Sequence, residues 1–245
     1  MPSSRVSQIL REIVDGHLDS AALPDRLVLS CARSLPRSGV GLMLMTDAGP
    51  AGMVATTVGA ASMLEQLQST LGQGPGVDSS RSGRPILVAD LAPSDQPRWP
   101  TFRVGALNAG VCAVFAFPLR VGGVRMGMLS LYREQAGMLP DAALAEALAF
   151  ADAATIILLY QQAQRVSTHA RPRTTPTAED RAQVHQATGM VSVQAGVSLV
   201  HALVLLRARA FAAEQPISTL ARDVLVGVTR FANDDGPILG AFGAP

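Results

Sequence analysis

The spacing of apolar positions along the first 165 residues alternates between helical and extended patterns, and each change marks a predicted element. Two helices are predicted within residues 6–35, with a break near Asp19 and Ser20. The other predicted helices cover residues 62–71, 101–110 and 141–164. In the first of these, Met63, Leu67 and Leu71 form the apolar stripe. Short apolar runs bounded by turn residues predict strands at residues 40–45, 53–58, 85–90, 111–120 and 124–133.

Two adjacent glycines separate the clearest pair of predicted strands. Gly122 and Gly123 readily adopt the positive φ angles of a tight hairpin turn. Pro118 lacks an amide N–H, so it predicts a bulge or an edge position in the first of these strands. Strands do not alternate regularly with helices, and the order therefore predicts an antiparallel sheet with helices grouped around it, an α+β fold.

A change of composition predicts a second domain. Residues 167–178 contain two prolines and no large apolar side chain, which is typical of a linker. Three helices are expected beyond it: 179–195 ending at Gly196, a second capped by Ser198, and a third capped by Ser218 and reaching Val228. The expected organisation is a sensor-sized domain at 5–165, a linker at 166–178, a three-helix bundle at 179–231 and a tail at 232–245.

The second of these helices is apolar on more than one face. One stripe consists of Leu199, Ala202, Leu203, Leu206 and Ala210, and a second consists of Val200, Val204 and Phe211. A helix of this kind must be covered on more than one side. Three short helices cannot do this alone, so the pattern predicts contact with the first domain or with a second copy. We expect a homodimer.

Charge and cysteine content narrow the class without naming a function. The formal charge of +1 gives no overall case for nucleic-acid binding, and 48% apolar residues exclude a disordered chain. Cys31 and Cys112 form no CxxC motif, and the N-terminus lacks an apolar stretch of signal-peptide length, so a reduced cytoplasm is expected. Glu146 and Asp152 interrupt the longest apolar stretch, and each costs roughly 2.5–3.5 kcal/mol at a bilayer centre. This stretch is predicted to be a buried or dimer-forming helix, with no membrane span.

Motifs for catalysis and metal binding are missing from the sequence. There is no HExxH, GxSxG or P-loop, and the chain has no lysine for Schiff-base chemistry. The four histidines do not follow metal-ligand spacing. The glycines at 72–76 follow a helix, and Pro75 removes an amide donor, so a plain turn is predicted there. No enzyme, metal or cofactor is expected, and an unrecognised catalytic site is the alternative left open.

Several segments, in the expected order and spacing, resemble parts of the GAF domains of actinobacterial proteins. They are residues 64–78, 82–90, 98–102, 113–124 and 127–133, and the resemblance extends over about residues 5–165. It implies an α+β domain that senses signals or small molecules, or that dimerises without a ligand. A pocket would then lie between the sheet and the loop at 90–102, with Asp90, Arg98, Trp99, Phe102, Phe117 and Arg120 as candidate lining residues. No particular ligand is indicated.

A second resemblance covers about residues 175–231. Residues 180–190, 196–198, 202–210 and 216–226 are similar to ANTAR domains, the three-helix RNA-binding modules of transcription antiterminators. The resemblance implies binding to paired RNA hairpins in a leader transcript. The implied RNA-binding residues are Gln186, Ala187, Thr188, Gly189, Arg207 and Arg222. Position 188 departs from the family pattern, because Thr188 stands where the family commonly has lysine.

The charge of this segment predicts weak intrinsic RNA affinity. Between residues 179 and 231, five arginines face four carboxylates, a surplus of one positive charge. Dimerisation would raise the affinity by presenting two copies. The sequence thus indicates a cytoplasmic, signal-responsive antitermination regulator that binds RNA. The alternative is a dimeric small-molecule-binding or scaffold protein whose helical tail has lost RNA binding.

Overall fold

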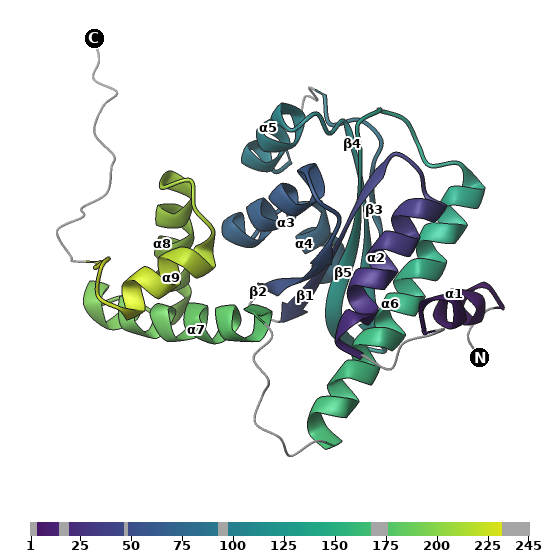
Figure 1. Ribbon diagram of the computed structural model, residues 1–245. Helices are drawn as coiled ribbons and strands as arrows, with labels where there is room; N and C mark the ends of the chain where they lie inside the picture. The colour runs from purple at the N-terminus through teal and green to yellow at the C-terminus, as the bar shows by residue number, and fades with distance from the viewer. Residues whose placement is uncertain (1–3, 15–19, 47–48, 93–97, 168–175, 232–245) are drawn as a thin grey trace, which may run out of the picture. The chain divides into compact units, whose positions relative to one another are not determined.

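The structure is a computed structural model, and it describes residues 4–14, 20–46, 49–92, 98–167 and 176–231. The chain divides into two compact units, Met1–Thr177 and Ala178–Pro245. The first unit is an α+β domain and the described part of the second is helical (Figure 1).

A five-stranded antiparallel sheet forms the centre of the first unit. Its strands are β1 (Ser38–Thr46), β2 (Gly49–Thr56), β3 (Ile86–Val88), β4 (Ala113–Val121) and β5 (Val124–Arg133). Their order across the sheet is β2-β1-β5-β4-β3. The predicted antiparallel α+β fold is confirmed, and the turn between β4 and β5 consists of Gly122, with φ 57°, and Gly123.

Helices cover both faces of this sheet (Figure 1). One face carries α1 (Ser4–Val14), α2 (Leu23–Ser34), which follows a 3-10 turn at Ser20–Ala22, and α6 (Asp141–Ser167). The other carries α3 (Ala60–Leu71), α4 (Pro75–Ser82) and α5 (Pro100–Asn108). Side chains alternate along a strand, so Phe115 and Phe117 of β4 point to the first face while Val114 points to the second.

The long helix α6 is a core helix along one side. Ala147, Phe150, Ala154 and Ile157 are buried against α1, α2 and the sheet. Glu146 on the same helix accepts a hydrogen bond of 2.8 Å from Arg5 Nε, and this pairing lowers the pKa of the Glu146 carboxyl. By length and composition α6 could cross a membrane, and nearly half of its apolar window is buried inside the protein instead.

Pro118 lies at a partly unpaired, irregular position of β4, as its missing N–H predicts. It pairs with Met128 of β5, whereas β3 pairs only with residues 114–116 on the other side of β4. Pro118 therefore lies where β4 has a strand partner on one side only. A register shift between Leu119 and Arg120 follows directly, so both predicted features are present.

The structure corrects the expected turn after α3. The sequence predicts a turn at 72–76, yet α4 begins at Pro75, and its Gly-, Asp- and Ser-rich sequence gave no helical signal. Proline is compatible with a first helical turn. Val77 is fully buried, and the Ser79 hydroxyl donates to the Ala116 carbonyl of β4 at 3.1 Å. Packing on the sheet thus overrides a weak helix propensity.

Three helices make up the described part of the second unit. They are α7 (Pro176–Ala195), α8 (Leu199–Ala212) and α9 (Ile217–Leu225). They share one cluster of buried side chains, to which Ala187, Val191, Ala202, Leu206 and Val224 belong. The Ser198 cap is confirmed, because its hydroxyl accepts from the His201 N–H at 3.3 Å.

Two expectations for these helices are wrong. Ser218 does not cap the third helix, because Pro216 is its N-cap and accepts the first helical hydrogen bonds, and the helix ends at Leu225 rather than Val228. Leu199 was expected in the core stripe of α8, but it is exposed at the first turn. Leu199 is not part of the buried cluster that contains Ala202 and Leu206.

Candidate functional site

A buried polar cluster lies between α3 and the sheet of the first unit. Glu65 and Gln68 are three residues apart on α3, and Ser130 and Tyr132 are two apart on β5. These spacings place each pair on one face of its element. Glu65, Gln68 and Ser130 have no solvent-exposed surface, and Tyr132 is 2% exposed. Four polar side chains are therefore enclosed within an otherwise apolar layer.

Hydrogen bonds join this cluster into a chain that reaches α4. The Tyr132 hydroxyl donates to Glu65 Oε1 at 2.7 Å, and Gln68 Nε2 donates to the Tyr132 oxygen at 2.8 Å. The Gly76 N–H, in the first turn of α4, donates to Gln68 Oε1 at 2.8 Å. The chain therefore runs from a carboxyl on α3, through β5, to the start of α4.

Two glycines make room for the cluster. A Cβ atom added at Gly41 of β1 would lie 2.2 Å from Glu65 Oε1, and one added at Gly76 would lie 2.2 Å from Met128 Sδ. Any larger residue at either position would have to displace these side chains. The space between α3, α4 and the sheet is therefore filled by the protein's own Glu65, Gln68 and Met128.

Burial sets the protonation of Glu65. It raises the pKa of the Glu65 carboxyl to about 7, although the contacts with the Tyr132 and Ser130 hydroxyls act in the opposite direction. Burial also raises the pKa of the Tyr132 hydroxyl well above its usual value, and the neighbouring Glu65 adds to this effect. Glu65 Oε2 and Ser130 Oγ make no regular hydrogen bond within the described structure. A carboxyl with one unpartnered oxygen and a raised pKa is a proton-binding group near neutral pH.

A second polar contact ties α4 to α5. Asp78 Oδ2 accepts from Trp99 Nε1 at 3.0 Å and from Arg98 Nη2 at 2.8 Å. The Arg98 guanidinium also lies over the Trp99 ring, 4.4 Å from its centroid. Trp99 has a φ of 52°, an uncommon conformation for a residue other than glycine. The contacts of Asp78 thus hold the N-terminus of α5 in a strained conformation.

The six expected pocket residues do not surround one cavity. Trp99 and Phe102 share a buried cluster on the α5 face, next to Tyr132. Phe117 lies in the cluster on the opposite face, because odd-numbered side chains of β4 point toward α1, α2 and α6. Arg98, Asp90 and Arg120 are exposed, and Asp90 Oδ1 accepts from its neighbouring Ala92 N–H at 2.7 Å. A groove of about 460 Å³ lies elsewhere, between α1 and α2, and none of these six residues lines it.

The expected RNA-binding residues divide into buried and exposed groups. Ala187 is fully buried, and Thr188 is buried with its hydroxyl donating to the Val184 carbonyl at 2.7 Å. Thr188 therefore does not present its hydroxyl to a phosphate. Gln186 is exposed and Gly189 is half-buried on the outer side of α7.

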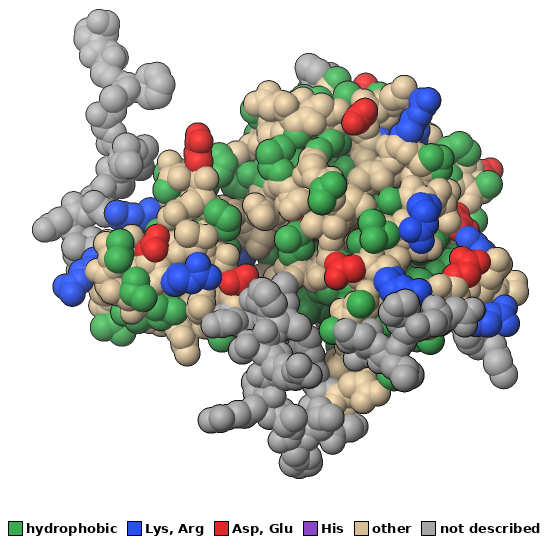
Figure 2. All heavy atoms as spheres, in the orientation of Figure 1, with side chains coloured by type: hydrophobic (Ala, Val, Ile, Leu, Met, Phe, Trp, Pro, Cys, Tyr) green, Lys and Arg blue, Asp and Glu red, His purple; other side chains and the backbone are tan. Residues whose placement is uncertain are grey.

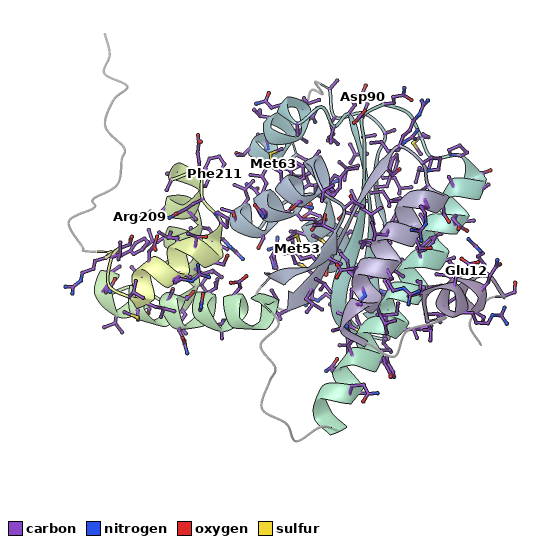
Figure 3. The ribbon with its side chains drawn as sticks, viewed as in Figure 1. Glu12, Met53, Met63, Asp90, Arg209 and Phe211 are labelled. Carbon is purple, nitrogen blue, oxygen red and sulfur yellow. The ribbon has the colours of Figure 1, made fainter. Side chains whose placement is uncertain are left out.

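Two arginines of the second unit contact other residues of the same unit. Arg222 lies 3.7 Å from Asp180, and Arg209 lies over the Phe231 ring at 5.2 Å. Arg207 is half-buried on α8. Arg209 and Phe211 project from α8 in Figure 3. On the face in Figure 2, basic side chains lie among acidic and apolar ones in each unit.

Gly189 is a helix-interior glycine without a packing reason. A Cβ atom added there meets nothing within 4 Å, and the residue has no positive φ. Glycine inside a helix costs about 1 kcal/mol relative to alanine. Packing within the unit therefore gives no cause for glycine at this half-buried place.

The one sequence signal for the buried cluster is a pair of polar residues, Glu65 and Gln68, which the apolar pattern of α3 did not identify as buried. The predicted stripe of α3 was Met63, Leu67 and Leu71, but Met63 is 48% exposed, and Leu67 and Leu71 are only partly buried. The fully buried positions are Leu64, Glu65 and Gln68. Two polar residues three apart on a short helix are ordinarily interpreted as its solvated side, so they were not predicted as a site.

Comparison with known proteins places the chain in a family. The model of the GAF domain family matches residues 25–195, more than half of the chain, and the chain belongs to this family. The match extends beyond the expected boundary at residue 165 into α7. No curated protein matches the chain.

Solved structures are similar to the chain at low identity. The GAF domain of a phosphoenolpyruvate-protein phosphotransferase from Coxiella burnetii is 18% identical over 67% of this chain and 99% of its own, with a TM-score of 0.49. A GAF domain/HD domain protein from Geobacter sulfurreducens is 16% identical over 63% and 98%, with a TM-score of 0.47. A type II free methionine-R-sulfoxide reductase from Thermoplasma acidophilum is 11% identical over 62% and 96%, with a TM-score of 0.43.

Proposed function

We propose that this chain is a signal-responsive transcription antitermination regulator that binds hairpin RNA in leader transcripts through α7, α8 and α9. The first unit is a GAF sensor domain. The similarity of residues 175–231 to ANTAR domains supports the RNA-binding half, which we treat as a three-helix bundle. The long helix α6 is proposed to transmit the signal by a change in how two copies of it pack.

The observation that carries this proposal is the exposed surface around Gly189. His185, Gln186, Gly189, Met190 and Val193 follow helical spacing on α7 and share one outward side. The missing side chain at Gly189 allows a phosphodiester backbone to lie close to the helix, next to the Gln186 amide. An amide side chain donates to phosphate oxygens and reads base edges in unpaired loops.

The small positive charge of the second unit predicts weak RNA binding by a single copy. Arg207, Arg222 and Arg230 lie on or beside this unit's surface, and Arg171 and Arg173 precede α7 in the sequence. Few phosphate contacts give low affinity and a shallow salt dependence. We propose that homodimerisation compensates, since two linked sites bind a paired hairpin more tightly than one. Apolar side chains left exposed on α6 and α8, such as Ile156, Leu159, Val200 and Phe211, fit such a dimer.

Replacement of Gly189 separates partner binding from folding. In Gly189→Ala, the added methyl group meets nothing in the protein, so the second unit is expected to gain up to about 1 kcal/mol of stability. RNA affinity is expected to fall about tenfold, because the methyl group holds the backbone away. Filter binding of a dual-hairpin leader RNA at low and high salt measures the affinity, and thermal unfolding measures the stability.

The matched control is Gly123→Ala in the β4–β5 turn. Its added methyl group also meets nothing, but it lies in the first unit and should leave RNA binding unchanged. Equal affinity of Gly189→Ala and the wild-type chain would contradict a role for this surface. Absence of binding by the wild-type chain, even at low salt, would contradict the RNA-binding function itself.

A second candidate function follows from the partners of the arginines. Thr188 is bound to its own helix, Arg222 lies beside Asp180, and Arg209 lies over Phe231. These contacts favour a dimeric scaffold or small-molecule-binding protein whose helical tail no longer binds RNA. In that case the wild-type chain would be dimeric and would not retain hairpin RNA. We place both alternatives in the cytoplasm, with no catalytic activity.

A further inference from the structure

We propose that the signal sensed by the GAF unit is the proton, which binds to Glu65 and thereby controls how firmly α4 is held against the sheet. This input concerns the sensor half of the proposed function and is tested without RNA. Glu65 is enclosed, a chain of hydrogen bonds joins it to α4, and α4 contacts Trp99.

The first step is the enclosure of the carboxyl. Glu65 has no exposed surface, and its Oε2 atom is unpartnered beside an enclosed Ser130 hydroxyl that also lacks a regular hydrogen bond. Tyr132 satisfies Oε1. The neighbouring Ser130 hydroxyl can accept from Oε2 of a neutral acid or donate to Oε2 of a carboxylate, so ionisation leaves a buried charge that only neutral hydroxyl groups contact.

The charged groups around Glu65 do not compensate for its ionisation. Strands β1 and β2 contain no ionisable side chain, and Glu65 is the single charged residue of α3. Among the ionisable groups of the described neighbouring elements, Tyr132 of β5 donates to Glu65, and Arg103 of α5 donates to the Leu91 carbonyl. On α4, Asp78 binds Arg98 and Arg81 Nη2 donates to the Gly72 carbonyl at 3.4 Å.

The second step couples this charge to α4. A buried carboxylate without a cation is unstable and is relieved when water reaches it. The layer that excludes water consists of α3 and the first turn of α4, which Gln68 holds through the Gly76 N–H. Tyr132 donates to Glu65 and accepts from Gln68, so any shift of the carboxyl moves both hydrogen bonds. Loss of the proton is therefore expected to loosen α4.

The third step provides a reporter. Asp78 lies on α4 and accepts from Trp99, the single tryptophan of the chain. Displacement of α4 changes this hydrogen bond and the exposure of the buried indole. The same contact would transmit the change to α5, whose N-terminus Trp99 caps. The coupling from Glu65 to Trp99 thus passes through β5, α3 and α4 within one unit.

The test is a pH titration of tryptophan fluorescence with the full-length chain. The wild-type protein is expected to show a reversible transition with a midpoint at the Glu65 pKa of about 7. Glu65→Gln keeps an acceptor for Tyr132 and a donor toward Ser130 but cannot ionise, so its fluorescence should stay at the low-pH value throughout. Glu134→Gln, which removes an exposed carboxyl of the same unit, should titrate like the wild type.

A direct observation of the carboxyl covers the case in which Glu65→Gln does not fold. Infrared difference spectra of the wild-type chain should show a protonated carboxylic acid that disappears on titration through the same midpoint. Loss of that signal already well below neutral pH would overturn the proposal. So would a fluorescence transition that persists in folded Glu65→Gln, or a wild-type signal that does not change.

Discussion

The GAF unit is expected to lose about 3 kcal/mol of folding free energy as the pH rises from about 4.5 to about 7, and Glu65→Gln should abolish this loss. The unfolded glutamate has its ordinary pKa of 4.5, whereas burial raises the pKa in the folded state to about 7. The folded state therefore binds the extra proton between these values. The stabilisation is complete below the unfolded pKa and is lost as the pH rises through the folded pKa.

Urea unfolding followed by Trp99 fluorescence at several pH values measures this effect in the first unit. Glu146 acts in the opposite sense: Arg5 lowers the pKa of its carboxyl, so the stability from this pair is complete above the unfolded pKa and is lost as the pH falls through the folded pKa. The difference between wild type and Glu65→Gln removes such contributions, because both proteins contain them. A difference that does not depend on pH would show that Glu65 is not protonated in the folded protein.

The core of the α5 face gives the other large expected effect. Phe102 of α5 is fully buried against Leu64, Leu91, Val114 and Tyr132. Phe102→Ala removes most of this contact and leaves a cavity, so the first unit should lose about 3–5 kcal/mol. Because Phe102 shares its cluster with Trp99, the variant should also expose the indole. Chemical unfolding and the fluorescence emission of the native state measure the two effects.

A neighbouring residue provides the control. Val104 is two positions away on α5 and 60% exposed, so Val104→Ala should change the stability by no more than about 0.5 kcal/mol. A small effect of Phe102→Ala would show that the α5 face is not a packed core.

Apolar periodicity predicted most of the GAF fold because the strands are regular. Residues 111–120 and 124–133 are mostly apolar runs of strand length, and the glycines at 122 and 123 mark the turn between them. The sequence did not indicate α4, since its Ser- and Gly-rich stretch is helical only through packing on β4. Elements that depend on tertiary contact carry little signal of their own.

The candidate site was not predicted, for a related reason. The sequence directed attention to aromatic residues and arginines around residues 90–120, but strand alternation places Phe117 on the opposite face from Phe102. Glu65 and Gln68 looked like the solvated side of α3, and the assignment of its buried side was wrong as well. Burial of a carboxyl depends on the partner strand, where Gly41 leaves room and Tyr132 supplies a hydroxyl.

In the second unit, the sequence located the helices but not which residues they expose. Thr188 was expected to reach phosphate, and instead it bonds the carbonyl one turn earlier. Gly189, two residues after the buried Ala187, is half-buried in the helix interior, and a Cβ added there would meet nothing. This open space became visible only with the helix packing, and it now supports the RNA-binding proposal better than any of the arginines.

The central claim is that α7, α8 and α9 bind hairpin RNA, and RNA co-purified with the full-length chain tests it most directly. Sequencing of RNA cross-linked to the wild-type protein in its own cells should recover a small set of leader transcripts, each with paired short hairpins, and Gly189→Ala should deplete them. Recovery of the same unselective RNA from wild type, Gly189→Ala and a chain without residues 178–245 would contradict the claim.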